Sequence, residues 1–237
     1  MRRSDLWPAA IAAACMASPA LAAPACDVPA AFPPLRAESA SDRDPRRVLP
    51  IGSYTLSVIW LPQECRTNGG FACANARNAG FVLHGLWPDG EAKDWPQWCT
   101  PAQMLPAATL KAHYCATPNP QLIQHEWAKH GTCMAGYTPD RYFTTSNRLF
   151  AGFVQPNLRS LSFRAQTAAS VQRAIARVNP GIGPDMMRLN LNKKGWLQEV
   201  WLCLDTQFKP ERCAADKGGA RPDDKVLIWR GGGRTRS

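Results

Sequence analysis

Cysteine number constrains this chain more than any other feature of its sequence. The 237 residues include nine cysteines, and the first, Cys15, lies in a short apolar segment near the N-terminus. The other eight are spread over the remaining chain: Cys26, Cys65, Cys73, Cys99, Cys115, Cys133, Cys203 and Cys213. The sequence has no Cys-x-x-Cys pair, which disfavours a zinc site. Eight cysteines in an exported chain predict four disulfides formed in an oxidising compartment.

Residues 1–23 have the composition of a secretory signal peptide. Two arginines follow the first methionine, an alanine-rich apolar run extends from Trp7 to Met16, and small residues then provide a cleavage site after Ala22 or Ala23. The apolar run is far shorter than the roughly 20 residues that a membrane span requires. The residues before Cys26 make a poor lipobox, which disfavours a lipoprotein. We therefore expect a mature protein that is periplasmic or secreted.

The positive charge of the chain favours an anionic partner. The formal net charge is +10, and it falls only to +9 without the signal peptide, because two arginines and one aspartate leave with it. This balance is typical of proteins that bind polyanions, either a nucleic acid or an anionic envelope surface. Many exported proteins are basic for solubility, so charge alone does not choose between these partners.

Beyond the signal peptide the sequence divides into three parts. Residues 24–50 are rich in proline, alanine and charged residues, and we expect a loosely ordered arm pinned by Cys26. Residues 51–230 are predicted to form the folded domain, and the glycine- and arginine-rich residues 231–237 a disordered tail. No later apolar segment is long enough to cross a membrane. A monomer is the default expectation.

Hydropathy patterns within the domain predict an α+β fold, a mostly antiparallel sheet flanked by helices. Runs of β-branched and aromatic residues indicate strands at 54–60, 81–84, 188–192, 197–205 and 225–230. Helices are expected at 102–113, 122–130, 139–153 and 170–178. Segments 65–80 and 87–101 are predicted loops, the first closed by a Cys65–Cys73 bridge. Strands and helices do not alternate regularly, which favours α+β over a parallel α/β sheet.

Three of the four histidines lie in two short clusters. The first cluster is FVLHGLWPDG (81–90), in which His84 ends an apolar strand and Gly85 follows it. A histidine in this place is held on rigid scaffolding at the rim of a sheet. A lone histidine there is more often structural than catalytic. The first cluster therefore indicates a catalytic site only in combination with the second cluster.

The second cluster is HEWAKHGTC (125–133), at the end of a short predicted helix. At 100° per residue, the first histidine and the lysine share one stripe, and the glutamate and the second histidine share the next. Trp127 lies on the reverse side, where it can anchor the helix in the core. Four ionisable side chains therefore project from one half of the helix: His125, Glu126, Lys129 and His130. A solvated charged face is disfavoured, because neighbouring cations would repel.

A zinc site is the main alternative for this cluster, because His-Glu-x-x begins a metalloprotease motif. That motif needs its second histidine at i+4, on the same helix face. Here i+4 is Lys129, and the next histidine, His130, stands at i+5, about 140° further round the helix. We therefore expect no metal site and no cofactor.

Two histidines and a lysine are suited to cleaving a phosphodiester. Because the ordinary pKa of histidine is about 6.5, one ring can be neutral and another charged near neutral pH. The neutral ring can take a proton from a ribose 2′-hydroxyl while the charged ring protonates the leaving 5′-oxygen. The remaining cations can offset the charge that builds on the phosphate oxygens. No metal is needed, because the nucleophile belongs to the substrate, and DNA lacks that nucleophile.

At these residues the chain resembles the ribonuclease T2 family, whose two signatures correspond to FVLHGLWPDG (81–90) and HEWAKHGTC (125–133). The similarity also covers YTLSVIW (54–60) and QEVWLCLD (198–205), and we extend it over residues 50–230. The resemblance implies an exported endoribonuclease that cleaves single-stranded RNA with broad base specificity. The products would be 2′,3′-cyclic phosphates, which are then hydrolysed to 3′-phosphates.

The resemblance also implies roles for individual residues. His84 would be the general acid and His130 the general base. Glu126 and Lys129 would stabilise the transition state, and His125 would bind phosphate. Trp87 would stack on a base, although a hydrophobic plug is the alternative, and Asp89 would accept a hydrogen bond from a base. The positions that are often aromatic in the family before the second signature are occupied here by Leu122, Ile123 and Gln124. His113 lies outside both signatures and is expected at the surface.

The same resemblance implies three further disulfide pairings. Cys99–Cys133 would join the loop after the first signature to the end of the second. Cys203–Cys213 would close the late hairpin-like segment, and Cys26–Cys115 is the pair that then remains.

A different class of function, a binding or cytotoxic protein that keeps the fold without the activity, would be favoured if a catalytic histidine were replaced. Both are intact, so the enzyme is the leading hypothesis.

Overall fold

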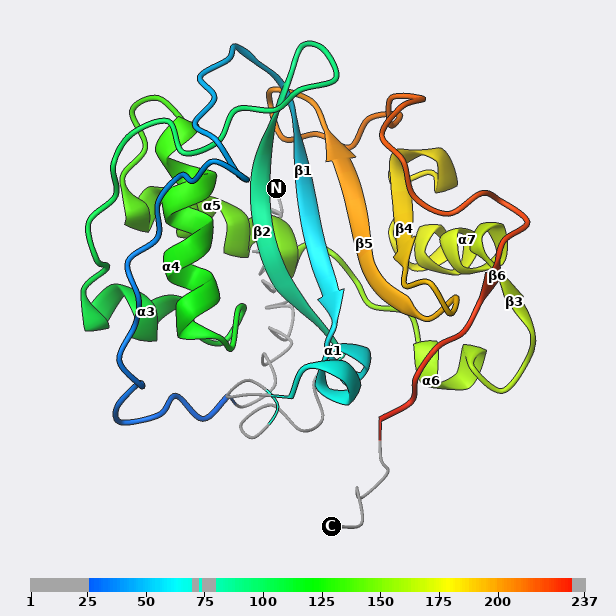
Figure 1. The fold of residues 1–237 in the computed structure, drawn as a ribbon. Coiled ribbons are helices and arrows are strands. Elements are labelled where there is room, and N and C mark those ends of the chain that lie inside the picture. The colour runs from blue at the N-terminus through cyan, green and yellow to red at the C-terminus, as the bar shows by residue number, and fades with distance from the viewer. Residues whose placement is uncertain (1–25, 70–72, 74–79, 232–237) are drawn as a thin grey trace, which may run out of the picture.

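The computed structural model describes residues 26–69, 73 and 80–231 (Figure 1). Its main sheet is antiparallel, with the strand order β2-β1-β5-β4. The strands of this sheet are β1 (Ile51–Trp60), β2 (Phe81–Gly90), β4 (Met187–Leu191) and β5 (Leu197–Leu204). A smaller sheet pairs β3 (Gln166–Thr167) with β6 (Lys225–Val226). The predicted α+β class and antiparallel sheet are confirmed.

Two groups of helices flank the main sheet (Figure 1). Helices α3 (Ala107–His113), α4 (Pro120–Lys129) and α5 (Pro139–Ala151) lie on the side of β2. Helices α6 (Leu158–Leu161) and α7 (Ala168–Val178) lie on the side of β4, and α1 (Leu61–Thr67) follows β1. Across the described residues, no helix combines the length and the apolar character needed to cross a membrane.

Several boundaries differ from those expected from the sequence. The second strand does not stop at Gly85 but continues to Gly90, so part of the expected 87–101 loop is strand. Helix α3 begins only after Pro106, and the helical turn α1 replaces the start of the expected 65–80 loop. In α1 the structural reason is Pro62 in the first turn, where the missing N–H group of proline costs no hydrogen bond, whereas in α3 Pro106 is the N-cap residue just before the helix.

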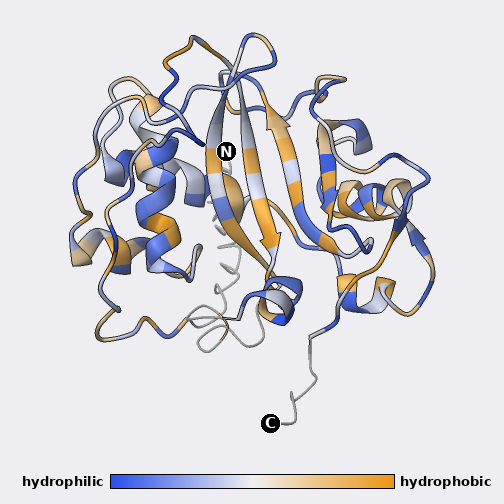
Figure 2. Cartoon of the chain, viewed as in Figure 1, coloured by the Kyte–Doolittle hydropathy of each residue, from blue (hydrophilic) through white to orange (hydrophobic). Residues whose placement is uncertain are grey.

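The two faces of the main sheet differ in chemistry. Along β1, Leu56 and Val58 point to the face that packs against the helices, while Thr55 and Ser57 point to the opposite face, as the period of two in a strand requires. The apolar face contributes to two core clusters, one around α7 and one around α3, α4 and α5. Figure 2 shows hydrophobic residues along the strands and both kinds of residue on α7. The polar face is therefore free to carry chemistry.

Helix α4 has strong signals at both ends. The Asn119 side chain accepts hydrogen bonds from the backbone N–H groups of residues 121 and 122, which caps the first turn. After the helix ends at Lys129, a Cβ at Gly131 would lie 2.8 Å from Cζ3 of Trp127 and 3.1 Å from Cγ of Tyr142. Only glycine fits this close approach, so the chain can turn sharply just after His130.

The four predicted disulfides are present. They are Cys26–Cys115, Cys65–Cys73, Cys99–Cys133 and Cys203–Cys213. Four such bonds indicate an oxidising compartment. The expected signal peptide lies outside the described residues, as does nearly all of the expected tail.

Residues 26–50 form a long arm with only isolated bridges, but the arm is not detached from the domain. Arg47 pairs with Gln97 through backbone hydrogen bonds of 2.9 Å in both directions. The ring of Phe32 lies 5.3 Å from that of Tyr114, close to where Cys26 is anchored. The arm thus packs along the side of the domain that carries α3 and α4 (Figure 1).

The expectation that His113 lies at the surface is wrong. As the last residue of α3 it is only 8% exposed, and its ring lies 5.1 Å from that of Phe143 on α5. The Asn147 side chain is 3.0 Å from its Nδ1 atom. Burial lowers the pKa of His113, so this histidine belongs to the packing of α3 on α5.

We predict that removing the Cys99–Cys133 bridge destabilises the fold more than removing Cys65–Cys73. A disulfide stabilises the fold mainly by lowering the conformational entropy of the unfolded chain, and longer loops give a larger effect. The two bridges span 34 and 8 residues, so removing them should lower the free energy of unfolding by about 4 and about 2.5 kcal/mol, respectively. Urea unfolding of the two double alanine variants measures the difference in the free energy of unfolding. Equal losses in both variants would contradict the prediction.

Candidate active site

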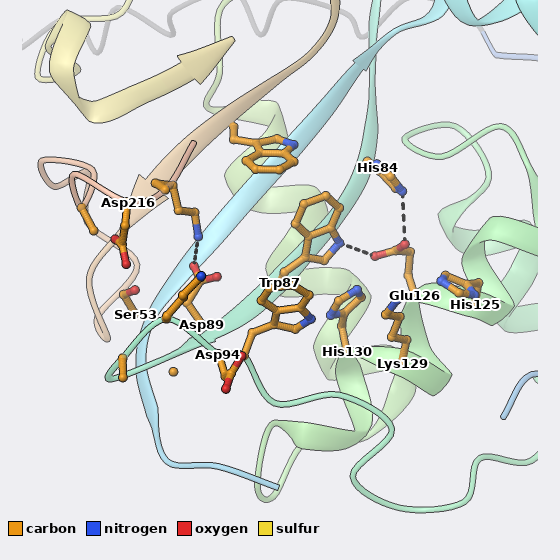
Figure 3. A pocket seen from close by; sticks show the side chains of 17 residues that line it. Ser53, His84, Trp87, Asp89, Asp94, His125, Glu126, Lys129, His130 and Asp216 are labelled. Carbon is orange, nitrogen blue, oxygen red and sulfur yellow. Dashed lines mark hydrogen bonds and ion pairs between the residues drawn. The ribbon is translucent and has the colours of Figure 1, made fainter. Parts of the chain in front are cut away.

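A β-bulge in β2 presents the first histidine. Ser57 of β1 pairs with Gly85 and Val58 with Leu83, so His84 is the extra residue that no partner on β1 opposes. A bulge re-aims a side chain without ending the strand. This explains why the strand continues where the sequence indicated an end, and it turns His84 toward the polar side of the sheet (Figure 3).

The imidazole of His84 lies between two carboxylates. Its Nδ1 atom is 2.8 Å from Oε1 of Glu199, and its Nε2 atom is 3.4 Å from Oε1 of Glu126. Burial alone would lower the pKa of His84. The charges of Glu126 and Glu199 outweigh burial, and the pKa lies above its ordinary value. His84 therefore favours the charged form.

Glu126, on α4, joins the two signatures. It is 2% exposed, and its Oε2 atom accepts a hydrogen bond of 2.7 Å from the indole Nε1 of Trp87. Burial raises the pKa of Glu126, and the charges of His84 and His125 only partly oppose this. An acidic group in contact with both a histidine and an indole fixes the geometry of all three.

His130 lies at the C-cap of α4 and is 6% exposed. Its ring stacks on Trp87, with a centroid distance of 5.4 Å and an interplanar angle of 28°. Its Nδ1 atom has no hydrogen-bond partner among the described residues. Burial, reinforced by the charges of Lys129 and His125, lowers the pKa of His130 well below its ordinary value. His130 is thus neutral under conditions in which His84 is charged.

The other two basic side chains of the second signature already have acidic partners from the arm. Lys129 Nζ is 2.7 Å from Oδ2 of Asp44, and His125 Nδ1 is 3.2 Å from Oε2 of Glu38. The indole Nε1 of Trp98 donates to the same oxygen of Asp44, at 3.0 Å. Although burial opposes it, these hydrogen bonds lower the pKa of Asp44, which stays ionised beside the lysine.

Asp89 lies at the other end of the site. Its Oδ2 atom accepts hydrogen bonds of 2.6 Å from Oγ1 of Thr55 and from Nζ of Lys217. One carboxylate oxygen is therefore engaged within the protein. A base could pair with the second oxygen or with the Lys217 ammonium.

The side chains of both signatures described above, with Lys217, line one cavity of about 470 Å³, and their partners Glu199, Glu38 and Asp44 lie behind them. In Figure 3, His84, Glu126, His125, Lys129 and His130 lie at one end and Asp89, Ser53 and Asp216 at the other. Trp87 lies between the two groups. Its ring centroid is 4.9 Å from that of His84 and 5.5 Å from that of Trp201. The cavity thus has a cluster of basic and acidic side chains at one end, a second polar group at the other, and an indole between them.

All seven residues predicted from the sequence line this cavity: His84, Trp87, Asp89, His125, Glu126, Lys129 and His130. Sequence reasoning missed Glu199, Lys217 and the arm carboxylates Glu38 and Asp44. Glu199 could have been suspected, because it alternates with Val200 and Leu202 on β5 and so shares the polar face. Nothing in the sequence pointed to the other three.

Among the described residues, no group of three or more histidine, cysteine, aspartate or glutamate side chains is arranged to hold a metal ion. Two of the imidazoles in the cavity instead have carboxylate partners, Glu199 and Glu38.

Comparison with known sequences identifies the fold and its chemistry. Residues 51–213, which include both signatures, match the Ribonuclease T2 family. The chain belongs to the ribonuclease T2 family. This T2 family member is accordingly an endoribonuclease, with three histidines in its cavity.

Relatives of this T2 ribonuclease occur in bacteria. It is 29% identical over 158 residues to a ribonuclease of Aeromonas hydrophila, covering 65% of this chain and 72% of the relative. It is 33% identical over 182 residues to a protein of Haemophilus influenzae named "Probable ribonuclease", covering 69% of this chain and 61% of the relative.

Solved structures show the same fold. Trichomaglin, described as an S-like ribonuclease, superposes with a TM-score of 0.60 at 19% identity, covering 75% of this chain and 97% of trichomaglin. RNase NT, solved in complex with 5′-AMP, gives a TM-score of 0.59 at 21% identity, covering 76% and 98%. The α+β sheet with its flanking helices is thus the T2 fold.

We predict that Gly85→Ala lowers RNA cleavage by about ten- to a hundred-fold, because a small displacement of a catalytic group is costly. A Cβ at Gly85 would lie 2.7 Å from Cδ of Glu126 and 2.9 Å from Nε1 of Trp87, so one of them must move. Steady-state kinetics measures the loss. Gly152→Ala is the control, since its Cβ would meet nothing closer than 3.4 Å. Full activity of Gly85→Ala would refute the role of this contact.

Proposed function

We propose that this enzyme cleaves single-stranded RNA by transesterification, with His130 as general base and His84 as general acid. One observation carries the proposal: two histidines in contact with the same tryptophan ring have pKa values displaced in opposite directions. A neutral imidazole and a charged imidazole in one cavity are what such a reaction needs.

The first step uses the substrate's own nucleophile. Because Nδ1 of His130 is buried, its Nε2 atom takes the proton from the ribose 2′-hydroxyl. The 2′-oxygen then attacks phosphorus, the bond from phosphorus to the 5′-oxygen breaks, and Nε2 of His84 gives its proton to that oxygen. The products are a 2′,3′-cyclic phosphate and a 5′-hydroxyl. Water then opens the cyclic phosphate to a 3′-phosphate, with the roles of the two histidines reversed.

Three further residues of the second signature act on the phosphate. Lys129 and Glu126 stabilise the pentavalent transition state, and His125 binds a phosphate oxygen. A phosphate reaches Lys129 and His125 by competing with Asp44 and Glu38, which occupy them in the free enzyme. A metal ion has no required part, because the nucleophile and both proton carriers are already present.

The opposite end of the cavity receives a base. Trp87 offers part of its ring for stacking, which contributes about 1–3 kcal/mol with any base. The contacts of Trp87 with His84, His130 and Glu126 also give it a packing role, so its two sequence-based interpretations are compatible. Asp89 accepts a hydrogen bond from the base through its second oxygen. Broad base specificity follows from stacking, and DNA is not cleaved.

The enzyme acts on RNA outside the cytoplasm, as a monomer that is exported by its signal peptide. The support for this is the set of four disulfides, the basic charge and the leader-like composition of the first residues. RNA scavenging or degradation is the role that suits such an enzyme.

Substitution of either histidine separates their roles. We predict that His84→Ala and His130→Ala each lower cleavage of a dinucleotide by about 10²–10⁴-fold without unfolding the protein. On a uridine nitrophenyl phosphodiester, whose leaving group needs no proton, His84→Ala should recover most activity and His130→Ala none. The all-deoxy analogue is the control and should not be cleaved. Equal losses of both variants on both substrates would refute the assignment.

The pH dependence follows from the two pKa directions. Activity requires neutral His130 and charged His84, so kcat/KM rises as pH rises through the lowered pKa of His130. It falls as pH rises through the raised pKa of His84. We therefore predict a bell-shaped profile whose limbs lie on either side of the ordinary histidine value of about 6.5. A single limb centred at that value would contradict the assignment.

A further inference from the structure

Glu199 reaches His84 across an intervening strand. Strands β2 and β5 both pair with β1, so the two residues lie on strands about 10 Å apart. The strand between them carries Ser57 at this point, facing Gly85 on one side and Trp201 on the other. These small residues on β1 and β2 leave room on the polar face for a long carboxylate side chain to meet the imidazole.

The carboxylate is held in place by three groups. Its Oε1 atom is 2.8 Å from Nδ1 of His84, and its Oε2 atom accepts hydrogen bonds from Nε1 of Trp201 at 2.7 Å and Oγ of Ser57 at 3.4 Å. Burial alone would raise the pKa of Glu199, but the hydrogen bond and charge of His84, with the two other donors, lower it. Glu199 thus stays ionised. Its contact with His84 is shorter than the 3.4 Å contact of Glu126.

We propose that Glu199 is the positioning residue of the general acid, fixing which nitrogen of His84 carries the transferable proton. This inference rests on the proposed function and extends it to a residue outside both signatures. Glu199 does not touch the reacting atoms, because it binds the nitrogen that faces away from Glu126 and the second signature.

The chemistry follows from the two ring nitrogens. The Nδ1–H group of His84 donates to Glu199 in both protonation states of the ring. The proton that leaves is therefore the one on Nε2, which goes to the 5′-oxygen of the departing nucleoside. Glu199 keeps its negative charge throughout and favours the imidazolium form between turnovers. A carboxylate that accepts a hydrogen bond from one ring nitrogen thus fixes the tautomer and the orientation of the imidazole, and with them the direction in which the other nitrogen points.

Other charged groups also act on His84. Glu126 on α4 contacts it directly, and Glu64 on α1 acts through its charge. His130, whose pKa is lowered, is the other imidazole in contact with Trp87, and it interacts electrostatically with His84. Only Glu199 and Glu126 are within contact distance, and Glu126 also contacts Trp87. Glu64 therefore offers a matched control for Glu199, because it is also a glutamate that acts on His84 through its charge but makes no hydrogen bond to the His84 ring.

The experiment compares Glu199→Gln with Glu64→Gln in the whole protein. For Glu199→Gln we expect the alkaline limb of the kcat/KM profile, and the NMR titration of His84, to move to lower pH by about one unit or more. For Glu64→Gln we expect a much smaller shift. Glu199→Ala should lower cleavage of a dinucleotide but spare the nitrophenyl phosphodiester, as expected of an impaired general acid. Near-UV circular dichroism monitors folding of each variant.

An unchanged pKa of His84 in Glu199→Gln, or a shift no larger than that of Glu64→Gln, would overturn the proposal. Equal losses of Glu199→Ala on both substrates would overturn it as well, because they would indicate a structural role. The NMR titration needs no turnover. If the wild-type protein did not cleave RNA, the proposed function would be wrong. The NMR titration would still test the pairing of Glu199 with His84, so the two failures can be told apart.

Discussion

The arrangement of the site depends on one buried carboxylate. Glu126 is almost inaccessible to water, and it contacts His84 from β2 and the indole of Trp87 at the same time. A buried charge is costly unless it is paired and hydrogen-bonded. That cost couples α4 to the edge of the sheet: any movement of the helix that separates Glu126 from its partners leaves an acidic group without compensation. Gly85 permits the contact, because a side chain there would occupy the place of the carboxylate.

The polar face of the sheet supplies the rest of the site. Residues that alternate with the core positions of β1, β2 and β5 point to this face, and they include Ser57, Trp87 and Glu199. The opposite face packs against the helices and keeps the strands in register. One antiparallel sheet thus separates stability from the site, since apolar positions hold the fold and the positions between them contribute side chains to the cavity or to its supports.

Much of this could be predicted from the sequence, because the signals are local. The strand expected at 54–60 and the helix expected at 122–130 follow from hydropathy patterns, and the structure extends the first to 51–60 and places the second at 120–129. The bulge at His84 could not be predicted, because it depends on pairing with a distant strand, and the sequence therefore ended β2 too early. His113 was misplaced for a similar reason: its burial results from packing on α5. The partners of Lys129 and His125 come from the arm, whose composition carried no such information.

The arm has a consequence for how strongly binding responds to ionic strength. Affinity for a polyanion usually falls with added salt in proportion to the number of phosphates that the protein neutralises, because bound counterions are released. In this enzyme two of the basic side chains in the cavity, His125 and Lys129, already contact internal acids, Glu38 and Asp44. In the proposed complex, the RNA backbone therefore replaces one anion with another at these points. In the proposed complex, the two side chains position the phosphates but contribute little to the dependence of RNA affinity on electrolyte concentration.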